Sequence, residues 1–339
     1  MSRLKGQVRD LAVAAVVAAG VVAWSCNAFA QPKIVDGPEV RWKLGAWGKP
    51  RAGTANVEKL KAFMDERTGG KFKIQIGYES FGQPKELLDL LKVGSLEMTN
   101  ICASYHPEKL PVYSALDLPF LPIPDTTVQE KVHNAFHKHP LVLKEFAGWK
   151  AMPYLSALLP NNEFVGRGKQ PKAVEDFKGM RVRALAGIGE AMRKLGAIPT
   201  SVDAAAFPTT YAHQAFRTYE VGKWYTENMM LGSVGCPTLI HVDRWAELPQ
   251  QYKDLLIEAQ PIAQAAAKAA YSAADEKNIP LFKKKLAFVK FTPDELAAFR
   301  KAGADSVWEE WVKLREGQGI PGRDLLNFLL TQAGAAPKS

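Results

Sequence analysis

The chain of 339 residues lacks most of the short motifs that mark common enzyme classes. No G-x-G-x-x-G follows an expected strand, and a phosphate-binding loop, a G-x-S-x-G elbow and a Cys-x-x-Cys pair are also missing. Internal repeats and low-complexity tracts are not found either. These gaps disfavour nucleotide-dependent enzymes, thiol redox proteins and repeat proteins, and they leave few signals of catalysis.

The charge of the chain is basic without being concentrated. The formal net charge is +9, and the positive residues are spread along the sequence. Such a protein attracts small anions, whereas a nucleic-acid-binding protein has a basic stripe that this chain lacks. With 47% hydrophobic and 23% charged residues, the composition is that of a globular protein, and the length suits two lobes.

The first thirty residues read as a signal peptide. A basic start precedes an apolar run at 11–24 that is short for a bilayer span, and "AFA" at 28–30 supplies small residues for cleavage. We expect cleavage after Ala30 and export to the periplasm; a lipid anchor at Cys26 is the less favoured alternative. The two other cysteines, Cys102 and Cys236, would then either pair or remain separate buried thiols.

The N-terminal part of the mature chain alternates between strands and helices. Strand patterns at 39–48, 73–78 and 97–104 are separated by helical patterns at 54–72 and 84–96. This β-α-β-α-β order predicts a mostly parallel sheet with helices on its faces. In such sheets ligands bind beyond the carboxyl ends of the strands.

A second α/β unit follows, together with a long helical region. "DFKGMRVRALAG" at 176–187 predicts a strand that leads into a helix, and 249–285 predicts a long alanine-rich helix with a kink at Pro261. Residues 288–303 read as a strand and a helix, and 305–314 as another helix. The pattern predicts two lobes joined by more than one crossing, with hinge closure over a ligand.

Two groups of side chains are candidates for chemistry. His133 and His137 have the spacing of metal ligands on one helix face, but no carboxylate accompanies them, so a solvated polar face is the favoured interpretation. Arg181 and Arg183 share one face of the predicted strand. They are either surface cations, or one of them binds a carboxylate through two parallel hydrogen bonds.

The sequence also resembles the solute receptors of TRAP (tripartite ATP-independent periplasmic) transporters. The resemblance covers nearly all of the mature chain and rests on "VEDFKGMRVRALAG", "FMDERTGGKFKIQIGYESFG", "LLKVGSLEMTNICASY", "ALDLPFL", "LGAIPTSV" and "WAELPQQYKDLLIEA" in the family's order. It implies an α/β, two-lobed periplasmic binding protein fold. Two mixed or parallel sheets would flank a ligand cleft, and a long helix would span the hinge. We assign residues 31–160 plus 235–275 to lobe I and residues 161–234 plus 276–339 to lobe II.

The family's ligand arginine falls on Arg183, which the resemblance implies binds a ligand carboxylate, while Arg181 is a solvated or lobe-stabilising cation. The other positions that the resemblance places around the ligand are Trp47, Cys102, Tyr105, Asn162, Glu163, Phe207, Thr209 and Tyr211. Aromatic residues replace polar contacts there, and Glu163 replaces a second arginine. This predicts an apolar or aromatic monocarboxylate.

One departure from the family is expected after "PTSV". Asp203 and Ala204 follow this motif directly, as though a helix that helps to enclose the family's cleft were missing.

The resemblance implies a monomeric periplasmic receptor, not an enzyme. It would deliver a small organic anion to the permease subunits of a TRAP transporter, with no cofactor and no nucleic acid. The alternatives are a receptor for a C4-dicarboxylate or sugar acid, the receptor of an ATP-driven importer, and a secreted α/β hydrolase or lyase.

Overall fold

The structure is a computed structural model that describes residues 33–200 and 203–338. The chain from Ile34 onward forms one compact unit. The predicted signal peptide and its cleavage site lie outside the described residues.

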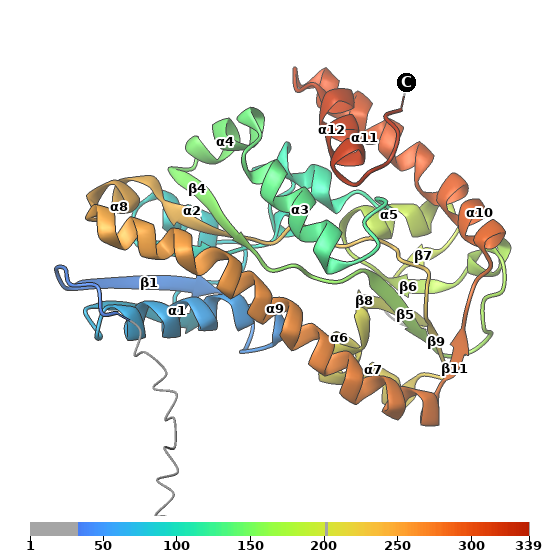
Figure 1. The fold of residues 1–339 in the computed structure, drawn as a ribbon. Coiled ribbons are helices and arrows are strands. Elements are labelled where there is room, and N and C mark those ends of the chain that lie inside the picture. The colour runs from blue at the N-terminus through green and yellow to red at the C-terminus, as the bar shows by residue number, and fades with distance from the viewer. Residues whose placement is uncertain (1–32, 201–202, 339) are drawn as a thin grey trace, which may run out of the picture. The chain divides into compact units, whose positions relative to one another are not determined.

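Lobe I is built around a mixed sheet, sheet A (Figure 1). In spatial order its strands are β2 (Phe72–Tyr78), β1 (Val40–Ala46), β3 (Met98–Asn100), β10 (Pro237–His241) and β4 (Ala151–Ser156). Strand β1 is parallel to β2 and β3, as the sequence predicts, whereas β10 is antiparallel to both of its neighbours. The helices of this lobe are η1 (Ala52–Thr54), α1 (Ala55–Arg67), α2 (Leu87–Lys92), η2 (Ala103–Tyr105), η3 (Tyr113–Asp117), α3 (Thr126–His137), α4 (Pro140–Ala147) and α8 (Val242–Glu247).

Lobe II is built around a second mixed sheet, sheet B. Its strands in spatial order are β11 (Ala287–Val289), β9 (Trp224–Thr226), β5 (Asn162–Gly166), β8 (Ala204–Pro208), β6 (Arg181–Arg183) and β7 (Ile198–Pro199). Its helices are η4 (Val174–Phe177), α5 (Ala186–Lys194), α6 (Thr209–Ala215) and α7 (Thr218–Val221). The remaining helices are α9 (Gln250–Lys285), α10 (Pro293–Gly303), α11 (Asp305–Gly317) and α12 (Gly322–Gln332).

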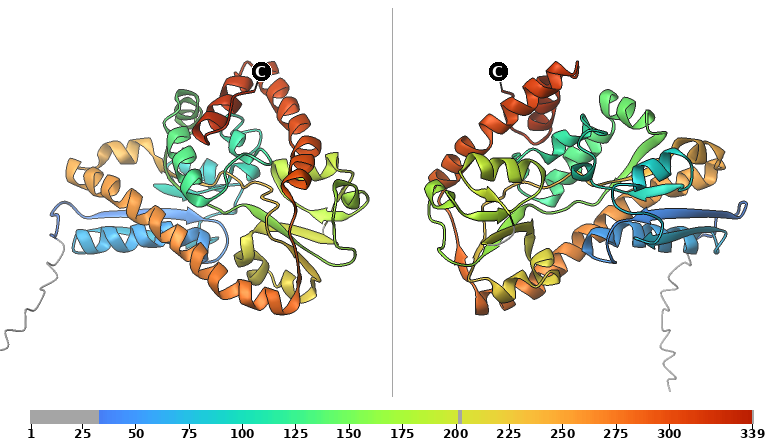
Figure 2. Two further views of the ribbon diagram at one scale, coloured as in Figure 1. Left: turned by 45° about the vertical axis from the view of Figure 1, so that its right-hand side comes forward. Right: turned by 180° about the vertical axis from the view of Figure 1, so that it is seen from behind.

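The predicted long helix is α9, which has 36 residues and runs along both lobes (Figures 1 and 2). Its first half packs on α1 and β4, and its second half packs on α6 and α7. Tyr154 donates a hydrogen bond to the Leu256 carbonyl at 2.6 Å in lobe I, and Tyr219 stacks on Phe282 in lobe II. The helix continues through Pro261, where the sequence predicts a kink.

The lobes share a hydrophobic core and several crossings of the chain. The largest core contains Leu88 and Phe136 of lobe I together with Phe164 and Ile188 of lobe II. A second core fills the space between sheet A, α1 and α9. The chain passes between the sheets in the segments before β5 and before β10 and along α9, while α12 returns to pack on α3. The predicted lobe boundaries themselves stay a prediction.

The turn from β6 into α5 brings the lobes together closely. A Cβ atom on Gly187 would lie 2.4 Å from the Asp117 carbonyl oxygen and 2.7 Å from the ring of Pro119. Only glycine allows this approach of the α5 N-terminus to lobe I. The small residues that follow "RVR" therefore have a packing role.

Candidate functional site

Arg183 lies at the end of β6, on the same face as Ala205 of the neighbouring strand β8. Its Nη1 donates a hydrogen bond to the Ala206 carbonyl at 3.0 Å, and its guanidinium carbon lies 4.1 Å from the centre of the Phe207 ring. Burial lowers the pKa of Arg183, and the Tyr105 hydroxyl of lobe I opposes that shift. Arginine keeps its charge despite such shifts, so this is a partly buried cation with unused N–H donors.

A hollow of about 400 Å³ lies beside this cation. Arg183 and Phe207 form part of its wall, and apolar side chains such as Val165 and Val221 form another part. Arg167 and the Asp203 carboxylate also line the hollow. Cations beside an apolar wall suit an anion with an apolar body.

Arg181 differs from Arg183 although the two share a strand. Its Nε and Nη2 donate to the Asp203 carboxylate at 3.0 and 2.9 Å, and about half of its side chain is exposed. The positive charge of Arg181 is thus already neutralised, which matches the lobe-stabilising role inferred from the resemblance.

An aromatic cluster joins the two lobes near Tyr105. Trp47 follows β1, Tyr105 follows β3, Tyr211 lies on α6 and Tyr271 on α9, and all four pack in one apolar cluster with Cys102. The Trp47 and Tyr105 rings meet edge to face at 5.9 Å, as do Tyr211 and Tyr271 at 6.0 Å. The carboxyl ends of β1 and β3 are therefore lined by aromatic side chains, where parallel sheets hold their ligands.

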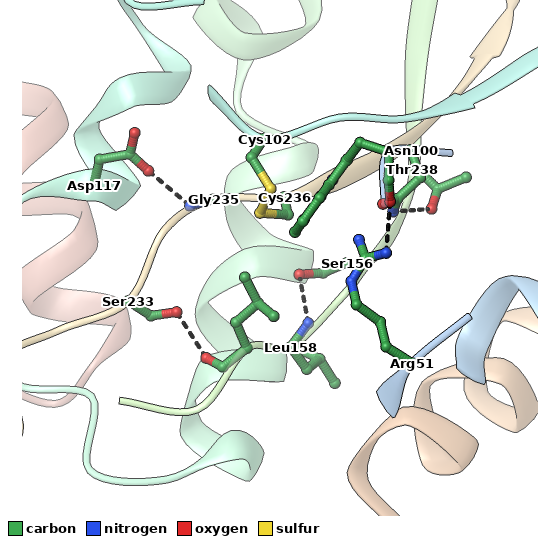
Figure 3. The surroundings of a disulfide bond; sticks show 12 residues. Arg51, Asn100, Cys102, Asp117, Ser156, Leu158, Ser233, Gly235, Cys236 and Thr238 are labelled. Atoms are coloured by element: carbon green, nitrogen blue, oxygen red, sulfur yellow. Dashed lines mark hydrogen bonds between the residues drawn. A yellow bond between two sulfur atoms is a disulfide. The ribbon is translucent and has the colours of Figure 1, made fainter. Parts of the chain in front are cut away.

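Cys102 and Cys236 form a disulfide, which answers the alternative that the sequence left open (Figure 3). Cys102 immediately precedes η2, which carries Tyr105, and Cys236 immediately precedes β10. The Ala103 amide also donates to the Gly235 carbonyl at 2.8 Å. The disulfide and this bond fix the Tyr105 loop to a segment that crosses between the lobes.

Glu163 and Asn162 use their polar groups inside the protein. The Glu163 carboxylate accepts hydrogen bonds from the Thr226 hydroxyl at 2.5 Å and from the Met229 and Met230 amides at 3.1 and 2.8 Å. Burial raises the pKa of Glu163 to about 7, while these donors act in the opposite direction. The Asn162 amide donates to the Gly232 carbonyl at 2.9 Å. Neither side chain lies in the aromatic cluster or on the hollow wall, and their ligand roles stay a prediction.

The expectation of a missing helix is wrong. Residues 204–208 form strand β8, and helix α6 begins directly after it at Thr209. Asp275 of α9 stabilises the start of α6 by accepting hydrogen bonds from the Thr210 amide, at 3.2 Å, and from the Thr210 hydroxyl. The local sequence around Asp203 and Ala204 resembles a turn and contains no sign of this contact, because its acceptor comes from α9. The side chain of Thr209 lies outside the described part of the chain.

The expectation of a solvated histidine face is also wrong. His133 and His137 on α3 are 2% and 7% exposed, and they share hydrogen bonds with the Ser156 hydroxyl at 2.6 Å and the Tyr113 hydroxyl at 2.8 Å. Burial lowers the pKa of His133 to about 3 and that of His137 to about 4. Burial keeps both rings neutral, and their hydrogen-bond partners inside lobe I satisfy their polar atoms in the core.

Sequence reasoning missed Arg51, which lies in the loop between β1 and α1. Its Nη1 donates to the Trp47 and Lys49 carbonyls at 2.5 and 2.9 Å, and its guanidinium carbon lies 3.6 Å from the centre of the Trp47 ring. Its position near the C-terminal end of β1 was the available signal, but lysine or arginine is common in such loops.

No group of three or more His, Cys, Asp or Glu side chains is arranged to hold a metal ion in the described part of the chain. No helix of the same residues has the length and apolar character needed to cross a membrane.

Two mixed α/β sheets, a long helix along both and a cation at the end of an inner strand define a two-lobed solute-binding protein. The chain belongs to the family of bacterial extracellular solute-binding proteins, family 7, whose model matches residues 47–314. The resemblance and the fold class predicted from the sequence are both confirmed. No curated protein is similar enough to count as a match.

Solved structures of TRAP periplasmic solute-binding proteins share this fold. One from a marine metagenome, specific for aromatic acid ligands and crystallised with 3-hydroxybenzoate, is 17% identical, with 88% of this chain and 99% of that one covered and a TM-score of 0.75. One from Sulfitobacter sp. NAS-14.1 with bound β-D-galacturonate is 14% identical, with coverage of 86% and 99% and a TM-score of 0.71. One from Sulfurospirillum deleyianum with bound succinate is 18% identical, with coverage of 86% and 99% and a TM-score of 0.69.

Proposed function

We propose that this protein is an extracytoplasmic receptor that binds an organic acid anion and delivers it to the permease of a TRAP transporter. Its ligand is a monocarboxylate with an apolar or aromatic body. No bond is made or broken; the receptor works as a periplasmic monomer. Family membership supports a receptor over a hydrolase, lyase or ATP-driven importer component.

The observation that carries this proposal is the contrast between the two arginines of β6. The positive charge of Arg181 is neutralised by Asp203, whereas the guanidinium of Arg183 donates to a backbone carbonyl, lies over an aromatic ring and forms part of the wall of the hollow. A carboxylate supplies the missing negative charge and accepts two parallel hydrogen bonds from a guanidinium. Arg183 therefore fixes the acid group, and the aromatic residues select the body.

A panel of acids tests the ligand class. Thermal shift against aromatic monocarboxylates, short dicarboxylates and sugar acids should give stabilisation by the first group. Mass analysis of the recovered compound should show it unchanged, since a receptor performs no chemistry. Tight binding of only dicarboxylates or sugar acids, as relatives with succinate and galacturonate exemplify, would refute the aromatic monocarboxylate, and a converted compound would refute the receptor.

Arg183→Lys tests the role of the cation. Lysine keeps the charge but loses the planar fork, and a hydrogen bond to a charged group contributes about 1.5–3 kcal/mol. We expect an affinity loss of about 10- to 100-fold by calorimetric titration, with little change in the apo melting temperature.

Arg181→Lys is the matched control on the same strand. It weakens only a half-exposed, solvent-screened ion pair, so affinity should change little. A larger loss of affinity for Arg181→Lys than for Arg183→Lys would contradict the assignment of the ligand cation.

A further inference from the structure

Three buried polar atoms without hydrogen-bond partners gather at one edge of sheet A. They are the Trp47 indole Nε1, the Arg51 Nη2 and the Asn100 Oδ1. The other such atoms among the described residues are scattered over β9, α3, α8, α11 and the residue after η2. A buried group without a partner costs about 1–3 kcal/mol, so three together call for an explanation.

The three atoms come from the ends of adjacent strands. Ala46 and Asn100 are paired in the register of β1 and β3, and Trp47 directly follows Ala46. Arg51 returns to this edge because its Nη1 donates to the Trp47 carbonyl while its guanidinium covers the Trp47 ring. In Figure 3 the guanidinium points toward the side on which Asn100 and Thr238 lie. The Asn100 Nδ2 is used by the Thr238 hydroxyl at 3.1 Å, which leaves only its oxygen unused.

This edge is the switch point of sheet A. Strand β1 lies between β2 and β3, so the chain leaves β1 toward β2 and then crosses back past β1 to reach β3. Connections that diverge in this way leave a crevice at the carboxyl ends of the two strands, and ligands of α/β proteins bind there. The unpartnered atoms are thus at the place where the fold itself favours a ligand.

The surroundings of Arg51 connect it to Arg183. Burial lowers the pKa of Arg51, and the hydroxyls of Tyr271, Tyr211 and Tyr105 act in the opposite direction. Tyr105 also acts on the pKa of Arg183, and its ring meets edge to face, at 5.9 Å, the same Trp47 ring that the Arg51 guanidinium covers. Tyr105 therefore connects the surroundings of the two guanidinium groups.

We propose that Arg51, together with Trp47 Nε1 and Asn100 Oδ1, is a second ligand-binding subsite that receives a ring hydroxyl on an aromatic carboxylate bound at Arg183. This inference rests on the proposed function. A hydroxyl accepts hydrogen bonds from Nη2 and Nε1 and donates one to Oδ1, so it satisfies all three atoms. An unsubstituted ring leaves all three unpaired, and a second carboxylate satisfies the donors but meets the Asn100 oxygen without a proton to share.

The test compares ligands within each variant, because Arg51 also supports the Trp47 loop. Wild type, Arg51→Gln and the exposed control Arg41→Gln are titrated calorimetrically with benzoate, 3-hydroxybenzoate, 4-hydroxybenzoate and isophthalate. Wild type and Arg41→Gln should bind one hydroxybenzoate at least about tenfold more tightly than benzoate and more tightly than isophthalate. Arg51→Gln should lose this preference while its benzoate affinity changes by less than about threefold. If Arg51→Gln does not fold, Arg51→Lys should retain part of the preference.

The outcomes separate the two proposals. Equal losses for benzoate and the hydroxybenzoates in Arg51→Gln identify a purely structural arginine and overturn the subsite, as does a wild type without preference for a hydroxyl. If Arg183→Lys is still damaging in those cases, the receptor function stands. If no benzoate derivative binds wild type, the subsite is overturned together with the aromatic monocarboxylate.

Discussion

The two arginines of β6 are two residues apart, and their neighbours give them different chemistry. Asp203 uses two donors of Arg181, whereas the guanidinium of Arg183 lies over the Phe207 ring at 4.1 Å. The aromatic face attracts the cation without using its hydrogen bonds. Phe207, predicted from the sequence to line the ligand site, therefore contacts the cation that we propose binds the ligand.

Phe207→Leu tests this positioning role. A cation–π contact at a partly buried site contributes about 0.5–2 kcal/mol, so the affinity for the cognate acid should fall about 2- to 30-fold. The control is Phe216→Leu, because the Phe216 ring is 66% exposed and stacks on Phe207 rather than on the arginine. Calorimetric titration of both variants gives the comparison. Equal losses in the two variants would show that the aromatic pair matters only as bulk.

At the level of single residues, the sequence predicted some parts of the candidate site and not others. The strand that presents Arg183 was predictable from alternation, and its ligand role was inferred from the resemblance. The partners of Glu163 were not predictable, because two of its donors are main-chain amides 66 and 67 residues further along the chain. Arg51 was equally hidden, since nothing local distinguishes a guanidinium that folds back over Trp47 from one in solvent.

At the scale of elements, periodicity predicted the order of strands and helices, and tertiary contacts decided the rest. The β-α-β-α-β unit and α9 follow apolar patterns, and both were found where expected. Helix α6 is short, and its first turn is stabilised by Asp275 of α9, which accepts a hydrogen bond from the Thr210 amide. Its local sequence pattern alone was therefore a weak signal. Helix α3 contains two polar histidines that are nevertheless buried, because side chains of other elements form hydrogen bonds with them.

The buried His133 of helix α3 should make the free energy of unfolding depend on pH. Burial lowers the pKa of His133 to about 3, whereas an unfolded histidine has a pKa near 6.5. Between these two pKa values His133 is protonated in the unfolded chain and neutral in the folded one. The free energy of unfolding therefore decreases as the pH falls from about 6.5 toward 4. We expect His133→Gln to reduce this loss by about 3 kcal/mol, measured by urea unfolding at pH 7 and pH 4.

The comparison must be between variants, because buried carboxyls act in the opposite direction. Burial raises the pKa of Asp117, Glu145 and Glu163 to about 7, so their contribution is fully present below about pH 4 and is lost as the pH rises through 7. These groups are the same in wild type and in His133→Gln, so their contribution cancels. Identical pH slopes in the two proteins would contradict the assignment of a neutral buried His133.

For the whole molecule, the disulfide closes a long stretch of chain that contains most of lobe II. Cys102 and Cys236 are 134 residues apart in sequence, and a disulfide that closes a long loop typically stabilises by about 2–4 kcal/mol. The double variant Cys102→Ser, Cys236→Ser should lose this amount in urea unfolding and should bind the cognate acid more weakly, since the Tyr105 loop is no longer tied. Adding a reductant should destabilise wild type and leave the double variant unchanged; an equal effect on both would point to another cause.

Helix α9 gives the molecule an elastic property. With 36 residues it is about 54 Å long and touches both lobes along its length. Pro261 and Pro280 remove one helical hydrogen bond each, and they lie in the parts that pack on lobe I and lobe II rather than between them. A change in the angle between the lobes must therefore bend an uninterrupted rod, which resists with a restoring torque. A ligand that changed this angle would have to supply the work of bending the helix, and its affinity would be lower by that amount.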